Sequence, residues 1–179
     1  MRMARVDREV SAEDVGSAET PNFDQWYSDA YPRVARTLAV LFGDVETGRD
    51  LAAEAFSRAF ERWEREDPPR SPDAWVMAVG INAGRRRWHR RRLEAEHLAR
   101  LGTEASATTG DVTADPELWV AVAALAPRER EAVVLRYVAD LKERDIAEVM
   151  GIEVGTVSAT LHRARARLRA ALEGAQHDG

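Results

Sequence analysis

At 179 residues, with 45 % hydrophobic side chains, the chain is long enough to fold as one ordinary domain or two small ones. It contains no cysteine, which excludes disulfide bonds, thiolate metal sites and thiol switches. No apolar run approaches the roughly 18 residues of a membrane span, and residues 1–21 lack the apolar core of a signal peptide, so we expect no membrane insertion and a cytoplasmic location.

The formal net charge of −5 hides two basic segments in an otherwise acidic chain. Residues 71–100 carry 7 positive and 3 negative side chains, and residues 154–172 carry 4 positive side chains and no negative one. A local excess of positive charge is typical of surfaces that contact nucleic-acid phosphates. The acidic average therefore does not exclude nucleic-acid binding.

All the predicted elements are helices. Residues 1–21 are polar and aperiodic and are predicted to form a disordered tail. From Phe23 to about Gly43, apolar residues recur at the spacing of one helical face, and Pro32 either kinks this helix or marks its start. Gly43 is expected to end the helix, and Asp44 to cap the next one.

A second apolar stripe begins at about Asp50. The prolines of residues 67–73, DPPRSPD, are expected to end this second helix. Ser71 is the predicted N-cap of a third helix, with Pro72 in its first turn. The second helix's stripe consists of Leu51, Ala55, Phe56, Ala59, Phe60 and Trp63.

The third helix is predicted to start apolar and to continue into the run RRRWHRRR at residues 85–92. Six guanidinium groups this close repel one another unless an anion compensates, which favours nucleic-acid phosphate over a merely solvated face. Trp88 either stacks on an unpaired base or packs in the core. Asn82 either bonds a neighbour or reads a base edge. Gly80 and Gly84 are expected to allow close approach of another backbone.

Residues 99–115 are mostly small, polar and turn-forming, and we predict a flexible linker there. Pro116 and Pro127 each start a further helix. Glu129 and Glu131 are expected near the positive end of the second helix's dipole. The predicted buried face of that helix comprises Val133, Val134, Tyr137 and Val138.

Residues 145–169 have the pattern of a helix-turn-helix. Ala147 is small enough for two helices to cross closely, Gly151 stands where the chain reverses, and Val157 begins the inner face of the second helix. The second helix of such a motif lies in the DNA major groove. A helical hairpin that serves only packing has the same apolar pattern and stays an alternative.

No catalytic constellation is visible in the sequence. The four histidines lack metal-ligand spacing, no glycine-rich phosphate loop precedes a helix, and the carboxylates are expected on exposed helical faces. We therefore expect no enzymatic activity, no cofactor and no metal site.

Five blocks together resemble the extracytoplasmic-function (ECF) sigma factors of the sigma-70 family, in particular an actinobacterial, sigma-E-like subgroup. The last block alone also fits the output domains of response regulators. The five blocks are residues 23–43, 50–60 (DLAAEAFSRAF), 72–82 (PDAWVMAVGIN), 124–138 (ALAPREREAVVLRYV) and 151–169 (GIEVGTVSATLHRARARLR).

The resemblance implies an all-α fold of two small helical domains joined by a flexible linker. Sigma region 2 would occupy residues 22–98, the linker residues 99–115, and region 4, with the helix-turn-helix, residues 116–173. Residues 1–21 and 174–179 would be tails.

The resemblance also implies three sets of binding residues. Those for core RNA polymerase would be Asp50, Leu51, Glu54, Phe56 and Arg58. Those for the promoter −10 element would be Arg70, Ser71, Trp75, Asn82, Arg85, Arg86 and Trp88. Those for the −35 element would be Thr156, Ser158, Ala159, Thr160, His162, Arg163, Arg165 and Arg167.

Some positions depart from the family pattern. Ala53 stands where the family usually has Gln, and Arg86 where it has Asp. Ser158 and Thr160 stand where basic residues are common. These departures bear on the promoter sequence rather than on sigma function.

The implied function is promoter-specific transcription initiation through recognition of the −35 and −10 elements and stabilisation of the open strand. The implied partners are core RNA polymerase (clamp and flap), promoter DNA and a separate anti-sigma factor. Bound to polymerase, the protein would be associated with the nucleoid. Two alternatives are a stand-alone helix-turn-helix regulator that binds duplex DNA without polymerase, and an RNA-binding or scaffold protein that uses the arginine run.

Overall fold

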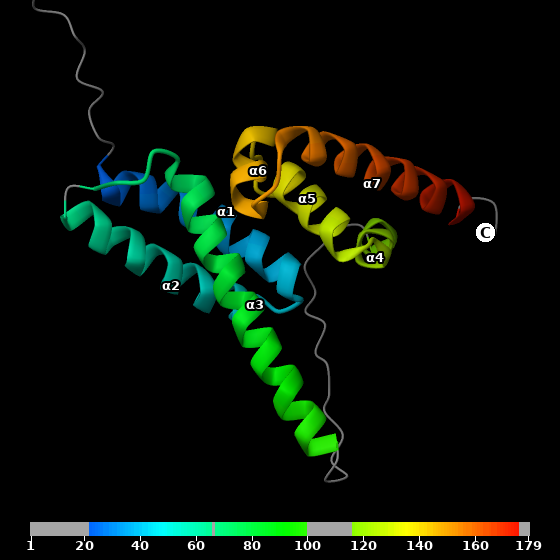
Figure 1. The fold of residues 1–179 in the computed structure, drawn as a ribbon, viewed down its shortest axis with the longest axis horizontal. Helices are drawn as coiled ribbons and strands as arrows, with labels where there is room; N and C mark the ends of the chain where they lie inside the picture. Colours follow the sequence, from blue (N-terminus) through cyan, green and yellow to red (C-terminus); the bar gives the residue numbers. More distant parts are fainter. Residues whose placement is uncertain (1–21, 66, 100–115, 176–179) are drawn as a thin grey trace, which may run out of the picture.

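The computed structural model describes residues 22–65, 67–99 and 116–175, which form seven α-helices and no β-strand (Figure 1). The all-α prediction is therefore confirmed. The predicted tail at residues 1–21, most of the predicted linker and residues 176–179 lie outside the described residues, as do the side chains of residues 92–99, 116, 174 and 175. The helices are α1 (Phe23–Phe42), α2 (Val45–Glu64), α3 (Pro72–Ala99), α4 (Pro116–Ala124), α5 (Pro127–Tyr137), α6 (Glu143–Met150) and α7 (Val154–Ala175).

Helices α1, α2 and α3 pack on one another and form the first unit (Figure 1). One predicted start is confirmed and another needs correction. Helix α1 begins at Phe23 and continues through Pro32, so the proline does not mark its start. Helix α2 begins at Val45 rather than near Asp50, where its apolar stripe starts.

The earlier start of α2 follows from its cap. Asp44 accepts a hydrogen bond from the backbone N–H of Thr47 at 2.7 Å, as an N-cap does. Hydrogen bonds from Thr47 also lower the pKa of Asp44. The preceding residue, Gly43, ends α1 at φ +75°, a conformation that glycine adopts without a Cβ clash. The predicted roles of both residues are confirmed.

Helices α1 and α2 cross closely at Gly48. A Cβ atom there would lie 2.5 Å from the backbone nitrogen of Ala39 and 2.7 Å from the carbonyl oxygen of Ala35. The expectation that Gly80 and Gly84 admit a backbone is wrong, because these two glycines face the side chains of Leu38 and Phe42. The fully buried side chains of this unit include Val34, Leu38, Leu51, Val76 and Met77.

Helices α4 to α7 form the second unit, and α6 and α7 form the predicted helix-turn-helix. Gly151 takes φ +64° at the end of α6, and the N–H of Ile152 donates to the Ala147 carbonyl at 3.0 Å, which closes the turn. Val157 is fully buried on the inner face of α7. Tyr137, which was predicted to lie on the buried face of α5, is 59 % exposed, so this part of the prediction is wrong.

The two units lie against each other. Helix α3 packs on α6, and α1 packs on α5, while α2 lies on the far side of α1 and α3 and has no extended contact with the described helices of the second unit (Figure 1). The structure is therefore a closed arrangement of two helical units.

Candidate nucleic-acid interface

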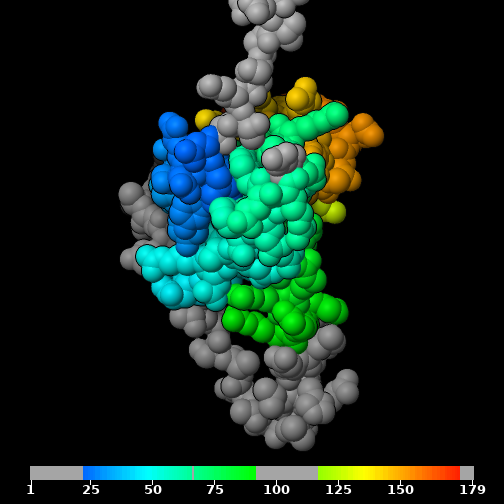
Figure 2. Space-filling model, turned by 90° about the vertical axis from the view of Figure 1, so that its left-hand side faces the viewer, coloured from blue at the N-terminus to red at the C-terminus, as the bar shows by residue number. Residues whose placement is uncertain are grey.

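Helix α2 presents a charged outer face. Glu54 and Arg58 form an ion pair one turn apart at 2.8 Å, and Asp50 lies 3.2 Å from Arg87 of α3. Figure 2 shows the side of the molecule formed by α1, α2 and α3, where the second unit is visible only at the margin. These charges are accessible to a partner while the two units are closed.

Two residues of the expected core-polymerase set are buried, within the predicted apolar stripe of α2. Leu51 and Phe56 are 0 % and 2 % exposed, so their predicted place on a binding surface is wrong. The reason is that the apolar stripe of α2 packs against α1. The ring of Phe56 lies 5.0 Å from that of Trp26 and 5.1 Å from that of Tyr27, measured between centroids. Both side chains therefore belong to the hydrophobic core.

The loop before α3 is held by Arg62. Its guanidinium donates to the Asp67 carboxylate at 2.6 Å and to the Asp67 carbonyl at 3.0 Å. It also lies 5.4 Å from the ring centroid of Trp75, within cation–π range. Trp75, in the first turn of α3, is half-buried. Arg70, in the loop before α3, is exposed.

Asp73 fixes the first turn of α3, a role that the sequence analysis missed. Its carboxylate accepts from the indole N–H of Trp26 at 2.7 Å and forms an ion pair with Arg33. Both partners lie on α1, about forty residues away, so no local pattern indicates them. The position of the −10 candidate residues on α3 thus depends on α1.

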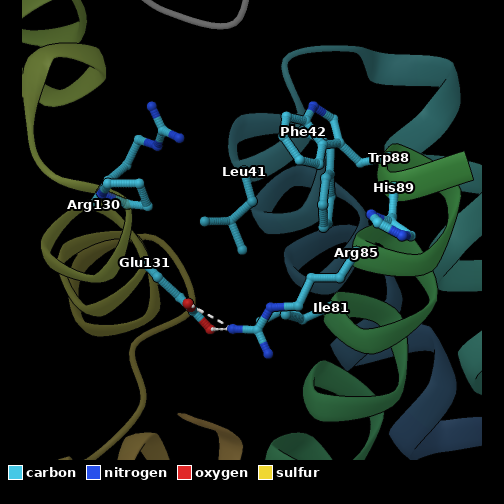
Figure 3. A pocket seen from close by; sticks show the side chains of 9 residues that line it. Leu41, Phe42, Ile81, Arg85, Trp88, His89, Arg130 and Glu131 are labelled. Carbon is cyan, nitrogen blue, oxygen red and sulfur yellow. Dashed lines mark hydrogen bonds and ion pairs between the residues drawn. The ribbon is translucent and has the colours of Figure 1, made fainter. Parts of the chain in front are cut away.

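The arginine run does not form one uniform surface. Arg86 is exposed, as expected for a phosphate contact, and Asn82 is also exposed. Arg85 instead donates to both carboxylate oxygens of Glu131 in α5, at 2.5 and 2.7 Å, and makes a longer contact with Asn82 at 3.4 Å (Figure 3). Arg87 faces Asp50.

Trp88 is 59 % exposed, so the alternative that places it in the core is wrong. It borders a pocket of about 500 Å³ between the two units (Figure 3). The other side chains that line the pocket are Leu41, Phe42, Ile81, Arg85, His89, Pro127, Arg130 and Glu131.

The candidate −35 residues lie on α7. Thr160 is a correction: it is 4 % exposed, and its hydroxyl donates to the Thr156 carbonyl at 2.7 Å, so it faces the helix and core rather than a groove. Ser158 bonds to Glu143 at the start of α6. The residues of this set that are exposed are Thr156, Ser158, Ala159, His162, Arg163, Arg165 and Arg167.

Two buried carboxylates on α5 contradict the expectation that all carboxylates lie on exposed faces. Glu129 and Glu131 are 5 % and 8 % exposed. Glu129 lies 2.7 Å from Arg167 and 3.8 Å from Arg163, and Glu131 holds Arg85. A buried carboxylate requires such partners, because desolvation of an unpaired charge is unfavourable. These three arginines lie 34 or more residues away, so helical periodicity cannot reveal them, whereas Arg128, 3.9 Å from Glu131, is one turn away on α5.

Within the described ranges, no cluster of histidine and carboxylate side chains is arranged to hold a metal ion. No helix among them has both the length and the apolar character needed to cross a bilayer.

Comparison with known families matches both units. The family model of sigma-70 region 2 covers residues 26–94, and that of sigma-70 region 4 covers residues 116–168. The RNA polymerase sigma-E factor of Streptomyces antibioticus is 32 % identical over 160 residues, which is 89 % of either chain. The ECF sigma factor SigW of Bacillus subtilis is 29 % identical over 147 residues, covering 72 % of this chain and 77 % of that one.

Solved structures support the fold. A sigma factor from Bartonella quintana, crystallised with the anti-sigma factor NepR, superposes with a TM-score of 0.69 at 20 % identity over 84 % of this chain and 96 % of that one. The structure of CnrH in complex with the cytosolic domain of CnrY gives 0.61 at 24 % identity, over 85 % and 88 %. With both sigma-70 regions matched and close to a third of its residues shared with full-length relatives, the chain belongs to the ECF family of RNA polymerase sigma factors.

Proposed function

We propose that this chain binds core RNA polymerase through α2 and directs it to promoters that both helical units read. The outer face of α2, with Asp50, Glu54 and Arg58, is the proposed contact for the polymerase clamp. The flap would be contacted by the second unit. We assign region 2 to residues 22–98 and region 4 to residues 116–173, connected by residues 99–115.

The proposed −10 surface consists of the loop before α3 and the exposed residues of α3. A base flipped out of the −10 element would be captured there, while arginines neutralise the backbone of the open strand. Flipping a base costs a few kcal/mol, which these contacts must offset. The proposed residues are Arg70, Ser71, Trp75, Asn82, Arg85, Arg86 and Trp88.

The N-terminal half of α7 is the proposed −35 reader, entering the major groove as in other helix-turn-helix proteins. Its exposed Thr156, Ser158 and His162 can bond phosphates or base edges, and Arg165 can bond phosphate. Arg163 and Arg167 share Glu129, so their contribution is partly neutralised inside the protein.

We infer further that the protein makes and breaks no covalent bond itself and acts in the cytoplasm, at the nucleoid when bound to polymerase. A separate anti-sigma factor is the proposed regulator. The structurally similar sigma factor from Bartonella quintana was solved in complex with an anti-sigma factor, and CnrH was solved in complex with the cytosolic domain of CnrY. Both complexes support the proposal.

One observation carries the proposal: a sigma-70 region 2 and a sigma-70 region 4 occur in one chain, on two separate helical units. A stand-alone regulator has no use for the charged face of α2. The test is gel filtration of the purified chain with core RNA polymerase. We expect a stable complex that contains both. Absence of a complex, together with tight duplex binding by the chain alone, would favour the stand-alone regulator.

A further inference from the structure

The first residue of α6 places a carboxylate against the recognition helix of the helix-turn-helix. Glu143 begins α6, and its carboxylate accepts a hydrogen bond from the hydroxyl of Ser158, 15 residues later, on α7. Glu143 is half-buried and Ser158 is exposed. Because α6 and α7 pack on each other, the pair lies at the edge where the two helices meet (Figure 1).

This edge belongs to the part of the motif that approaches DNA. A helix-turn-helix inserts the N-terminal residues of its second helix into the major groove, while the first helix crosses the DNA backbone. Ser158 lies in the first half of α7 and shares one side of that helix with the exposed His162. Buried Ile146 and Val157 fix α6 and α7 in the core, so the position of the pair is set by packed helices and not by a loop.

Glu143 has the opposite charge to the arginines of α7. Residues 154–172 carry four arginines and no carboxylate, so Glu143 supplies a negative charge that this stretch lacks. Within the described ranges no arginine or lysine forms an ion pair with Glu143, and Ser158 is its hydrogen-bond partner. The phosphates of any approaching DNA repel a carboxylate that no cation neutralises. The acid therefore weakens binding to sequences that offer it no hydrogen-bond donor.

The chemistry of the major groove limits what that donor can be. A carboxylate only accepts hydrogen bonds, and the base edges donate there from N4 of cytosine and N6 of adenine. Adenine also presents the acceptor N7 beside N6, which suits an amide side chain and repels a carboxylate. Cytosine has no acceptor beside its amino group, so it is the base that fits Glu143. Ser158 uses one of about four lone-pair positions on the carboxylate, which leaves others for the base.

We propose that Glu143 reads a cytosine of the −35 element by accepting a hydrogen bond from its N4 amino group, and that Ser158 positions the carboxylate. The proposal rests on the proposed function, which places α7 in the major groove at −35. It also gives a physical reason for the serine at 158, where basic residues are common. An arginine there would pair with Glu143 and neutralise it, whereas serine orients the carboxylate and leaves it charged.

The test is a selection of DNA by the full-length chain in complex with core RNA polymerase. Duplexes that are randomised through the promoter region are incubated with the complex, and the bound DNA is isolated and sequenced. For the parent chain we expect cytosine to be enriched about fivefold or more at one position of the upstream element, the lower end of discrimination by a base contact. For Glu143→Ala we expect the preference at this position alone to disappear.

The matched control is Glu148→Ala. It removes an exposed glutamate from the same helix, about 140° around the axis from Glu143, and is expected to select the same sequence as the parent chain. The positioning role of Ser158 has its own comparison. Ser158→Ala is expected to weaken the preference for cytosine, whereas Ser158→Thr keeps the hydroxyl and is expected to retain it. Circular dichroism checks that each variant is folded.

A second measurement separates base reading from simple repulsion. Fluorescence anisotropy compares two duplexes, the selected sequence and the same sequence with the cytosine replaced by thymine. We expect the parent complex to bind the selected duplex about fivefold more tightly, and the Glu143→Ala complex to bind both equally. If Glu143→Ala tightens binding to both duplexes by the same factor and keeps the preference, the carboxylate only repels DNA and the proposal is overturned.

The selection also distinguishes this proposal from the proposed function. Enrichment of the same upstream sequence by the parent chain and by Glu143→Ala overturns the reading by Glu143 and leaves the −35 role of α7 standing. Absence of an enriched upstream element with the parent chain overturns both. Loss of the preference in Glu148→Ala overturns the proposal as well, because the effect would then not depend on the pair with Ser158.

Discussion

Individual side chains on α2 have two distinct tasks, which depend on the direction in which each one points. Glu54 and Arg58 face outward and are available to a partner, whereas Leu51 and Phe56 face α1 and are buried. The exposed charges are expected to govern binding, and the buried rings are expected to govern stability. Substitutions at one residue of each kind separate these tasks.

Glu54→Arg is expected to weaken binding to core RNA polymerase by about tenfold or more, because it places a positive charge where the proposed clamp contact has a negative one. The control is Glu64→Arg, an equal charge reversal at an exposed position near the end of the same helix. Fluorescence anisotropy of labelled protein titrated with core polymerase measures both. Equal affinities for the two variants would refute the role given to Glu54.

Phe56→Ala is expected to lower the free energy of unfolding by about 3–5 kcal/mol, the range for truncation of a buried ring. Phe60→Ala is the comparison, because the Phe60 ring is 45 % exposed and its loss removes less burial. Urea denaturation followed by circular dichroism measures both. A similar loss in both variants would mean that Phe56 is not the core residue described here.

At the scale of helices, a few residues determine where each element starts, stops and crosses its neighbour. Local signals predict many of these features: Gly43 and Gly151 end helices at positive φ, and Pro127 starts one. At the start of α2 two local signals disagree: the Asp44 cap places the start at Val45, as observed, whereas the apolar stripe begins only near Asp50. The close crossing at Gly48 has no signature in the local sequence, because the atoms it avoids belong to α1.

Gly48→Ala is expected to destabilise the protein by about 1–3 kcal/mol, because the new methyl group would force α1 and α2 apart. Gly155→Ala is the matched control. A Cβ at Gly155 meets no atom within 4 Å, so alanine's higher helix propensity should stabilise α7 by up to about 1 kcal/mol. Thermal unfolding compares the two. If both substitutions stabilise the protein, the helix crossing is looser than the structure indicates.

The arginines of α7 are expected to differ in function according to the side of the helix they occupy. Arg165 has no carboxylate partner in the described part of the chain, whereas Arg167 pairs with the buried Glu129. Arg165→Ala should therefore reduce the salt dependence of duplex binding by about 0.9 in log–log slope, the value for one lost phosphate contact, and leave stability unchanged. Arg167→Ala should lower stability. Equal salt slopes for Arg165→Ala and the unchanged chain would contradict the assignment.

At the scale of the whole molecule, the sequence predicts two helical units with separate binding surfaces but not how the units close. Thr160 illustrates the limit: its place in the predicted recognition helix suggests a contact with DNA, yet its hydroxyl donates to the Thr156 carbonyl within α7. Glu131 illustrates it further, because its partner Arg85 is 46 residues away, in the other unit. Periodicity reports which face of a helix is apolar, and it carries no information about which charged residues meet across a boundary.

The closed arrangement also bears on how the protein would act. Helix α2 stays accessible, while Arg85 and Ser71 contact the second unit. The proposed contact for polymerase is therefore open in this structure, as are Arg70, Asn82 and Arg86 of the proposed −10 set.

The most direct test of the central claim is transcription in vitro with core RNA polymerase and the purified chain, using the upstream regions of the source genome as templates. We predict start sites that depend on the chain and share sequence elements near −10 and −35, and we predict their loss with Glu54→Arg. Start sites that are identical with and without the chain would contradict the account.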